Sequence, residues 1–407
     1  MNPRAELAAA PRIPLRYLVE FNPRPRPTSD ESCYLPMEAI SEFGGTDTSR
    51  TRPTSDLLSG YSFVADGDVA YAKVTPCFEN GKGLLARDLP NGYAFATTEI
   101  SVLRPRHGLD ARFLAWILQS GDFRSSGVSQ MTGSGGLRRV PDSFAASFRV
   151  PAPRVEVQRA IADYLDRETA QIDAFIAKNE ELITLLTERR ASVLRAAMGE
   201  GSSRMRLRQV LTVAQTGPFG TQLSASEYID DGVPVINPSH IVAGVIAHDP
   251  GVSVSVERAG ELSRFRLSPD DIVLGRKGEV DKAALVDEES DGYLCGSDSM
   301  MLRPTKSIVH PKYLWWFLQS PPAHEQLERF AVGSTVVGLN QRTLRVVQLP
   351  VPSLEEQKAI TADLNRATAA IGSAMSVAKR SVELARERRA ALISAAVTGK
   401  IDVGVAA

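Results

Sequence analysis

The sequence predicts an α+β protein with two mixed α/β domains, each followed by a long helix, and the two helices paired as an antiparallel coiled coil with pseudo-two-fold symmetry. First, residues 151–197 return without a gap as residues 350–396, an offset of 199 residues (350 minus 151) in a chain of 407. Solenoid repeats are far shorter, so this period indicates duplicated domains. Second, apolar residues in both copies follow a coiled-coil spacing. Third, the residues before each copy contain matching strand and helix patterns.

Composition is that of an ordinary globular protein, with 43% hydrophobic and 23% charged residues. No run approaches the roughly 18 apolar residues that a membrane span needs. The first residues lack the continuous apolar core of a secretory signal, so we expect a cytoplasmic protein without a membrane partner. Cys33, Cys77 and Cys295 are scattered, odd in number and without CxxC spacing, which argues against zinc and against a disulfide framework.

The formal net charge is −1, so bulk electrostatics do not mark the chain as a nucleic-acid-binding protein. Basic residues gather only locally, and such clusters are often no more than solvated surface. If DNA is the ligand, we expect a partner to supply part of the contact with the phosphates. The local clusters are Arg104 with Arg106, Arg138 with Arg139, Arg204 with Arg206 and Arg208, Arg276 with Lys277, and Arg342 with Arg345.

The first domain is expected over residues 1–150. Residues 67–73 form an apolar block opened by a turn carboxylate, and residues 102–105 form a second apolar block, as strands do. Residues 113–120 read as an apolar helix whose aromatic side chains belong to the core. Asn80-Gly81 has the composition of a hairpin turn, and Gly133-Ser134-Gly135-Gly136 that of a flexible loop without the spacing of a nucleotide cradle.

The first long helix is expected within residues 151–203. It begins after Pro151-Ala152-Pro153, because these prolines force extended backbone. About 43 residues would span roughly 65 Å. One apolar seam predicts a helical partner, and the simplest partner is the other copy; Asn179 and Arg190 are polar seam residues of the kind that fix register. The seam consists of Ile161, Leu165, Thr169, Ile172, Ile176, Asn179, Ile183, Leu186, Arg190, Val193 and Ala197.

The second domain is expected over residues 204–349, the second long helix over residues 350–402 and a tail over residues 403–407. Residues 270–276 match the first apolar block of the first domain, residues 301–304 match its second block, and residues 313–320 match its helix. The second seam consists of Ile360, Leu364, Thr368, Ile371, Met375, Ala378, Val382, Ala385, Arg389, Leu392 and Ala396.

No catalytic constellation is visible in the sequence. There is no HExxH motif and no Walker A loop, and Asn237-Pro238-Ser239-His240 only partly matches the Asn-Pro-Pro-aromatic tetrapeptide of amino-methyltransferases. The five histidines show neither metal-ligand nor triad spacing. Three interpretations stay open: a non-catalytic DNA-binding adaptor, a DNA-modifying enzyme with an unrecognised site, and a coiled-coil scaffold without DNA specificity.

The chain resembles the DNA-specificity subunits of type I restriction-modification systems over nearly its whole length. The resemblance rests on the two Pro-x-Pro…Gln-x-x-Ile-x-x-x-Leu helices, on the Glu-Arg-Arg triplets at 188–190 and 387–389, and on the ending at residues 397–402. Residues 75–82, 216–220 and 232–241 are similar to recurrent segments of target-recognition domains in that family. Met198-Gly199-Glu200-Gly201 departs from the corresponding ending of the second copy, so the two helix ends need not bind partners identically.

The resemblance implies two target-recognition domains that each read one half of a bipartite, asymmetric target in double-stranded DNA, with the helices setting the unread gap. It also implies that this chain is not an enzyme. Catalysis would belong to methyltransferase subunits, which we expect to number two, and to restriction subunits. S-adenosylmethionine, ATP and magnesium are therefore expected only on the partners, with no cofactor and no metal on this chain. The sequence leaves open the target bases, the gap length and whether the system restricts or only methylates.

Direct readout of bases needs Arg or Lys toward guanine and Asn or Gln toward adenine, on loops or strand ends. Phosphate contacts are at least as common, so several such residues would only position the domain. The candidate DNA contacts are Lys73, Thr75, Asn80 and Lys82 in the first domain and Gln222, Asn237, Ser239, Arg276 and Lys277 in the second. The triplets Glu188, Arg189, Arg190 and Glu387, Arg388, Arg389 are candidates for docking partner subunits, the alternative being an ordinary charged helix end.

Overall fold

The computed structural model describes residues 3–134, 136–198, 203–218, 220–276, 282–330, 340 and 343–403. The chain divides into two compact units. The first comprises Met1–Glu180 and Arg380–Ala407, and the second comprises Glu181–Lys379. Each long helix therefore contributes residues to both units.

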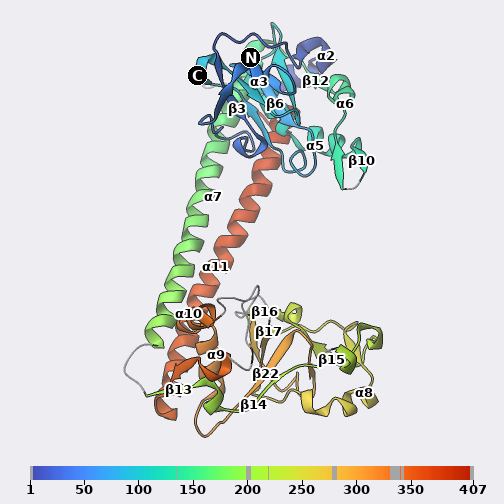
Figure 1. Ribbon diagram of the computed structural model, residues 1–407. Coiled ribbons are helices and arrows are strands. Elements are labelled where there is room, and N and C mark those ends of the chain that lie inside the picture. The colour runs from blue at the N-terminus through green and yellow to red at the C-terminus, as the bar shows by residue number, and fades with distance from the viewer. Residues whose placement is uncertain are drawn as a thin grey trace. The chain divides into compact units, whose positions relative to one another are not determined.

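The first unit is built on two four-stranded sheets, drawn in blue and cyan in Figure 1. One is fully antiparallel, in the order β2 (Val19–Phe21), β9 (Ile100–Pro105), β6 (Val69–Ala72) and β7 (Gly83–Leu85). In the other, β3 and β8 run parallel. Its order is β4 (Thr51–Pro53), β3 (Glu31–Leu35), β8 (Tyr93–Ala96) and β5 (Ser62–Ala65).

Helices complete the core of the first unit. Helix α4 (Ala111–Gln119) packs on β6 and β7. Its side chains Phe113, Leu114 and Ile117 are buried together with Leu165 and Ile393 from the two long helices. The remaining helices are α1 (Pro3–Ala9), α2 (Leu15–Leu18), α3 (Thr54–Leu57), α5 (Gly121–Ser129) and α6 (Asp142–Ser147), and the two small ribbons are β1 (Arg12–Pro14) with β12 (Arg149–Pro151) and β10 (Thr132–Ser134) with β11 (Leu137–Arg139).

The second unit repeats this topology. Its antiparallel sheet has the order β14 (Leu211–Thr216), β22 (Ser299–Pro304), β19 (Ile272–Gly275) and β20 (Ala283–Leu285). Its other sheet has three strands, with β15 and β21 parallel as β3 and β8 are. The other elements are β18 (Ser253–Val254), β15 (Val233–Ile236), β21 (Leu294–Cys295), the ribbons β16 (Ile241–Val242) with β17 (Val245–Ile246) and β13 (Arg204–Arg206) with β23 (Gln348–Pro350), and the helices α8 (Val256–Glu261), α9 (Pro311–Leu318) and α10 (Pro321–Phe330).

The long helices are α7 (Val155–Ala197) and α11 (Leu354–Val397), green and red in Figure 1. None of the predicted seam residues of either helix is exposed. Within the first unit, Asp173 pairs with Arg389 at 2.8 Å and Glu180 pairs with Arg386 at 2.7 Å. Rising numbers on one helix thus meet falling numbers on the other, so the pairing is antiparallel. The predicted fold class is confirmed.

The predicted elements of the two halves are also present. The blocks at 67–73 and 270–276 contain β6 and β19, those at 102–105 and 301–304 fall in β9 and β22, and the apolar helices are α4 and α9. The proline segments are extended, as expected, and they form strands. Pro151 lies opposite Arg12 in one ribbon, and Pro350 lies opposite Arg204 in the other. The start of each half therefore holds the chain just before its long helix.

A buried glutamine explains why Pro-x-Pro and Gln recur together. Gln158 is fully buried, and its amide nitrogen donates to the carbonyl oxygens of Pro153 at 2.8 Å and Gly108 at 2.9 Å. Its amide oxygen accepts the backbone N–H of Asp110 at 2.8 Å. Gln357 makes the equivalent bonds in the second unit. Its partners are the carbonyls of Pro352 (2.9 Å) and Ile308 (3.0 Å) and the N–H of His310 (2.8 Å).

Candidate nucleic-acid interface

An ion pair to a buried carboxylate lies at the start of one inner strand of each antiparallel sheet. Arg104 donates from Nε and Nη2 to the two oxygens of Asp68 at 2.7 and 2.8 Å. Arg303 does the same to Asp271 at 2.8 and 2.7 Å. Both carboxylates are 1% exposed. They directly precede β6 and β19 and are the predicted turn carboxylates of these strands. A buried charge needs such a partner, and bidentate geometry adds directional constraint.

The far ends of these strands carry two predicted DNA contacts in equivalent places. The backbone N–H of Lys73 donates to the Glu99 carbonyl at 2.8 Å, and that of Arg276 donates to the Asp298 carbonyl at 2.9 Å. Both side chains are half-buried. Lys277 lies outside the described residues, as does Gly333-Ser334-Thr335, whose sequence corresponds to the glycine-serine segment at 133–136.

The segment from Thr75 to Lys82 connects β6 to β7 in a hairpin, so the turn predicted at Asn80-Gly81 lies within its loop. Asn80 is exposed, and Gly81 has a left-handed φ of 78°. Thr75 precedes a cis proline, and its hydroxyl donates to the Gly136 carbonyl at 3.1 Å. Lys82 faces inward, because its ammonium donates to the Met37 carbonyl at 3.1 Å. Thr75 and Asn80 therefore remain accessible from this loop, whereas the Lys82 ammonium serves the loop's own structure.

The ribbon β10–β11 lies against this loop and adds two arginines that were not among the candidates. Arg138 exchanges two hydrogen bonds with Thr75: its N–H donates to the threonine hydroxyl, and its carbonyl accepts the threonine N–H, both at 2.9 Å. Arg138 also pairs with Glu79 at 3.0 Å, and Arg139 pairs with Glu99 at 2.7 Å. The hydrogen bond from Arg139 lowers the pKa of the Glu99 carboxyl, and the same bond raises the pKa of Arg139.

The available sequence signal for this ribbon was the Arg138-Arg139 pair directly after a glycine-rich turn. The expected flexible loop is instead a hairpin, in which Thr132 lies opposite Arg139 and Ser134 opposite Leu137. Lys73, Thr75, Asn80 and the two ribbon arginines thus come from one strand end, one loop and one ribbon of the first unit. Together they form a polar surface on which both arginines are paired with carboxylates, Arg138 with Glu79 and Arg139 with Glu99.

In the second unit, two of the candidates flank the turn between β21 and β22. Asn237 is half-buried, and its side-chain oxygen is buried without a hydrogen-bond partner among the described residues. A Cβ at Gly296 would lie 2.2 Å from that oxygen, so only glycine allows the approach. Arg276 is bonded to the same turn through Asp298. Ser239 is exposed two residues after Asn237.

Gln222 lies elsewhere in this unit, in the short helix η4 (Gly220–Gln222), where its carbonyl accepts a bond from Arg258. Arg276, Asn237 and Ser239 thus lie along connected segments, while Gln222 is held by a different contact. Whether these residues touch DNA stays a prediction.

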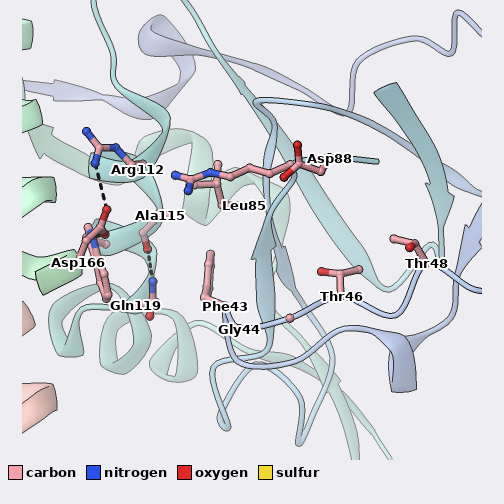
Figure 2. Close-up of a pocket in the computed structure, with 13 residues that line it drawn as sticks. Phe43, Gly44, Thr46, Thr48, Leu85, Asp88, Arg112, Ala115, Gln119 and Asp166 are labelled. Carbon is pink, nitrogen blue, oxygen red and sulfur yellow. Dashed lines mark hydrogen bonds and ion pairs between the residues drawn. The ribbon is translucent and has the colours of Figure 1, made fainter. Parts of the chain in front are cut away.

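A concavity beside helix α4 of the first unit has a different character. A pocket of about 470 Å³ lies between α4, the loop after Phe43 and Asp166 of α7 (Figure 2). Arg112 donates to Asp166 at 3.0 Å, and the indole of Trp116 donates to the same carboxylate at 2.9 Å. None of the predicted DNA contacts lines this pocket. The candidate interface is therefore separate from this pocket and consists of a strand end, a loop and the β10–β11 ribbon.

In each Glu-Arg-Arg triplet the first two side chains are exposed and the last is partly buried. Glu188, Arg189, Glu387 and Arg388 are exposed, which is compatible with docking. Arg389 instead pairs with Asp173 and lies 5.9 Å from the Trp116 ring centre. Arg190 lines a pocket of about 640 Å³ with Trp315 and Glu325 in the second unit.

Among the described residues, no group of three or more His, Cys, Asp or Glu side chains could hold a metal ion. No helix there is both long and apolar enough to cross a membrane.

Known proteins resemble this chain in sequence and in fold. Residues 200–373 match the family model described as "Type I restriction modification DNA specificity domain". The EcoEI specificity subunit of Escherichia coli is 28% identical over 69% of this chain and 46% of its own length. The EcoAI specificity subunit of Escherichia coli is 34% identical over 43% of this chain and 32% of its own length. The chain thus spans less than half the length of these two curated relatives.

Solved structures share the fold over almost the whole chain. A chain from a study of complex assembly and conformational transition of the type I R-M system superposes with a TM-score of 0.76 and 18% identity, covering 96% of this chain and 98% of that one. The HsdS subunit of Thermoanaerobacter tengcongensis gives a TM-score of 0.53, also at 18% identity, with 96% and 97% covered. At this identity the likeness establishes a common fold.

Proposed function

We propose that this chain, an HsdS-like member of the specificity subunits of type I restriction-modification systems, is the non-catalytic subunit that selects the DNA target of such a complex. The observation that carries the proposal is the contrast within the duplication. The strand order of the antiparallel sheet, the Arg–Asp pairs with their buried carboxylates and the buried glutamines recur in both units. The segments at the strand ends, residues 73–82 and 276–282, differ in sequence, as expected of two readers of different half-sites.

The proposed target is bipartite and asymmetric double-stranded DNA. In the first unit the reader is the surface formed by Lys73, Thr75, Asn80 and the β10–β11 ribbon. In the second unit it includes Asn237, Ser239 and Arg276, with Gln222 and Lys277 as further predicted contacts. Different donors in the two readers favour different bases. The continuous helices α7 and α11, of 43 and 44 residues, act as the ruler that sets the unread gap.

Catalysis is proposed to reside on partner subunits. Methyltransferase subunits with S-adenosylmethionine would modify adenines, and restriction subunits with ATP and magnesium would cleave. Two methyltransferase subunits are favoured because the exposed Glu-Arg pairs occur twice, at 188–189 and at 387–388. Such a complex would work on DNA in the cytoplasm.

The test is to co-express the full chain with its candidate methyltransferase subunit and to map adenine methylation across the host genome. We expect one bipartite motif with a fixed gap, and no methylation from the chain alone. The absence of a bipartite motif would refute the proposal that the chain is a DNA-binding adaptor. Modification of DNA by the chain alone would favour a stand-alone enzyme. Replacing residues 1–150 with another such domain should change one half-site only; a change in both would contradict the modular reading.

A further inference from the structure

The ribbon β10–β11 projects as a polar reader that is exposed yet held in place. All six of its paired residues are exposed, and Leu137 keeps 48% of its surface. The bonds between Arg138 and Thr75 attach one side of the ribbon to the 75–82 loop. A bridge between Val74 and Arg139 attaches its end to the continuation of β6. The ribbon therefore needs little reordering to meet a ligand.

Arg139 is presented on this ribbon with its guanidinium already oriented. Its Nε donates to one oxygen of Glu99 at 2.9 Å, and its Nη2 donates to the other at 2.7 Å. Two parallel bonds fix the plane of the guanidinium, which a single bond does not. The guanidinium of Arg138, in contrast, makes a single bond among the described residues, from Nη2 to Glu79. The arginine with the more defined direction is thus Arg139, and its side chain is still 46% exposed.

The bonds to Glu99 leave the other edge of the guanidinium available. A guanidinium has five N–H donors, and Glu99 uses one on Nε and one on Nη2. The remaining donors on Nη1 and Nη2 lie parallel, at the end of the side chain. That pair matches O6 and N7 of guanine, the commonest specific contact in the major groove. Ribbons of two strands fit that groove.

We propose that Arg139 is a specificity-determining residue that donates from Nη1 and Nη2 to a guanine in the half-site read by the first unit, with Glu99 as its positioning residue. This inference rests on the proposed DNA-reading function and adds a base, a side chain and an orientation to it. The proposed contact with guanine is made from the ribbon and involves neither the 470 Å³ pocket nor the two long helices.

The chain offers a closely matched control. Arg154 donates to both oxygens of Glu6, from Nε at 3.0 Å and from Nη2 at 2.7 Å, on a side chain that is 56% exposed. The same substitution, Arg to Gln, therefore breaks the same kind of pair in the same unit, away from the ribbon. Thermal unfolding of each variant separates a folding defect from a change in recognition.

The experiment compares wild type, Arg139→Gln, Glu99→Gln and Arg154→Gln in the co-expressed complex. Genome methylation supplies the motif, and rates on duplexes with each base pair substituted supply the discrimination. We expect Arg139→Gln to relax one G·C position of one half-site by about ten- to hundredfold. Glu99→Gln should relax the same position to a smaller extent, because a neutral amide cannot hold both guanidinium donors. Arg154→Gln should leave every letter unchanged.

Three results would overturn the inference while leaving the proposed function standing. One is an unaltered motif and discrimination in folded Arg139→Gln. Another is a uniform loss of activity across sequences with a shallower salt dependence, because that is the signature of a phosphate contact. The third is a wild-type motif whose half-sites contain no G·C pair that Arg139→Gln relaxes. A wild type without any bipartite motif would instead refute the proposed function itself.

Discussion

Replacing Gln158 with leucine should destabilise the first unit strongly, because the side chain joins three backbone groups that have no other hydrogen-bond partner among the described residues. The substitution keeps the apolar stem and removes the amide. The N–H of Asp110 and the carbonyls of Gly108 and Pro153 then lose bonds of 2.8, 2.9 and 2.8 Å. An unsatisfied buried group costs about 1–3 kcal/mol.

Three such groups would lower the free energy of unfolding by about 3–9 kcal/mol at most. Structural relaxation and the entry of water at the proline turn would reduce this loss. The added transfer of leucine to a dry site returns about 2 kcal/mol. The expected loss is therefore about 3–5 kcal/mol. The Asp110 side chain accepts the N–H groups of Arg112 and Phe113, so loosening its backbone should also loosen the start of α4.

The assay is urea unfolding of the full chain, with hydrogen exchange to locate the change. Two units need not unfold in one step, so exchange is required to assign the loss. Amides of α4 and the first turns of α7 should lose protection in Gln158→Leu, while Gln357→Leu should affect α9 and the start of α11 instead. Gln171→Leu, at an exposed position of the same helix, is the control. A loss below about 1 kcal/mol in Gln158→Leu, or equal deprotection of both units, would refute the reasoning.

Three further outcomes follow from the same structure. Gly296→Ala should destabilise the second unit, because its Cβ would lie 2.2 Å from the Asn237 side-chain oxygen, whereas Gly260→Ala in α8 meets nothing within 4 Å and should be neutral or slightly stabilising; urea midpoints compare the two. The hydrogen bond from Arg139 lowers the pKa of Glu99, so the contribution of the pair to the stability of the ribbon is fully present above about pH 4.3 and is lost as the pH falls through the lower pKa of the folded state. Amide hydrogen exchange in the ribbon should show this loss, and Arg139→Gln should abolish it. Adding one heptad to both α7 and α11 adds about 10 Å to each, so the methylation motif should gain a gap of about three base pairs with unchanged letters, and altered letters would contradict the ruler.

Local patterns were sufficient to predict the helices and the central strands. Seam residues such as Leu165 and Leu364 lie where the four-three spacing puts them, because the spacing itself records which side of a helix is buried. The proline segments at 151 and 350 were extended for an equally local reason. Their pairing with Arg12 and Arg204 was not predictable in this way, since the partners are more than a hundred residues away.

The candidate interface was predicted less completely, for the same physical reason. Residue type marks a side chain as able to bind DNA, but tertiary contacts decide where it points. Lys82 belongs to the right loop, yet the Met37 carbonyl takes its ammonium. Arg139 was noted as part of a basic cluster but was not among the candidate DNA contacts, and Glu99, 40 residues earlier, orients it. Neither partner is encoded by spacing.

The duplication itself argues that divergence at the strand ends is functional. In the first unit the indole of Trp116 donates to Asp166, and in the second the indole of Trp316 donates to Asn365 at 3.1 Å, so a supporting contact survives a change of residue. At the proposed reader a backbone hydrogen bond is preserved, whereas the residues between the strands are not. Lys82 and Lys282 both accept a bond at the backbone carbonyl, from Ala72 and Gly275, but the loops that lead to them differ in sequence. Under the proposed function, a fold that keeps its supports through substitution and changes its strand-end segments would alter one half-site without disturbing the other.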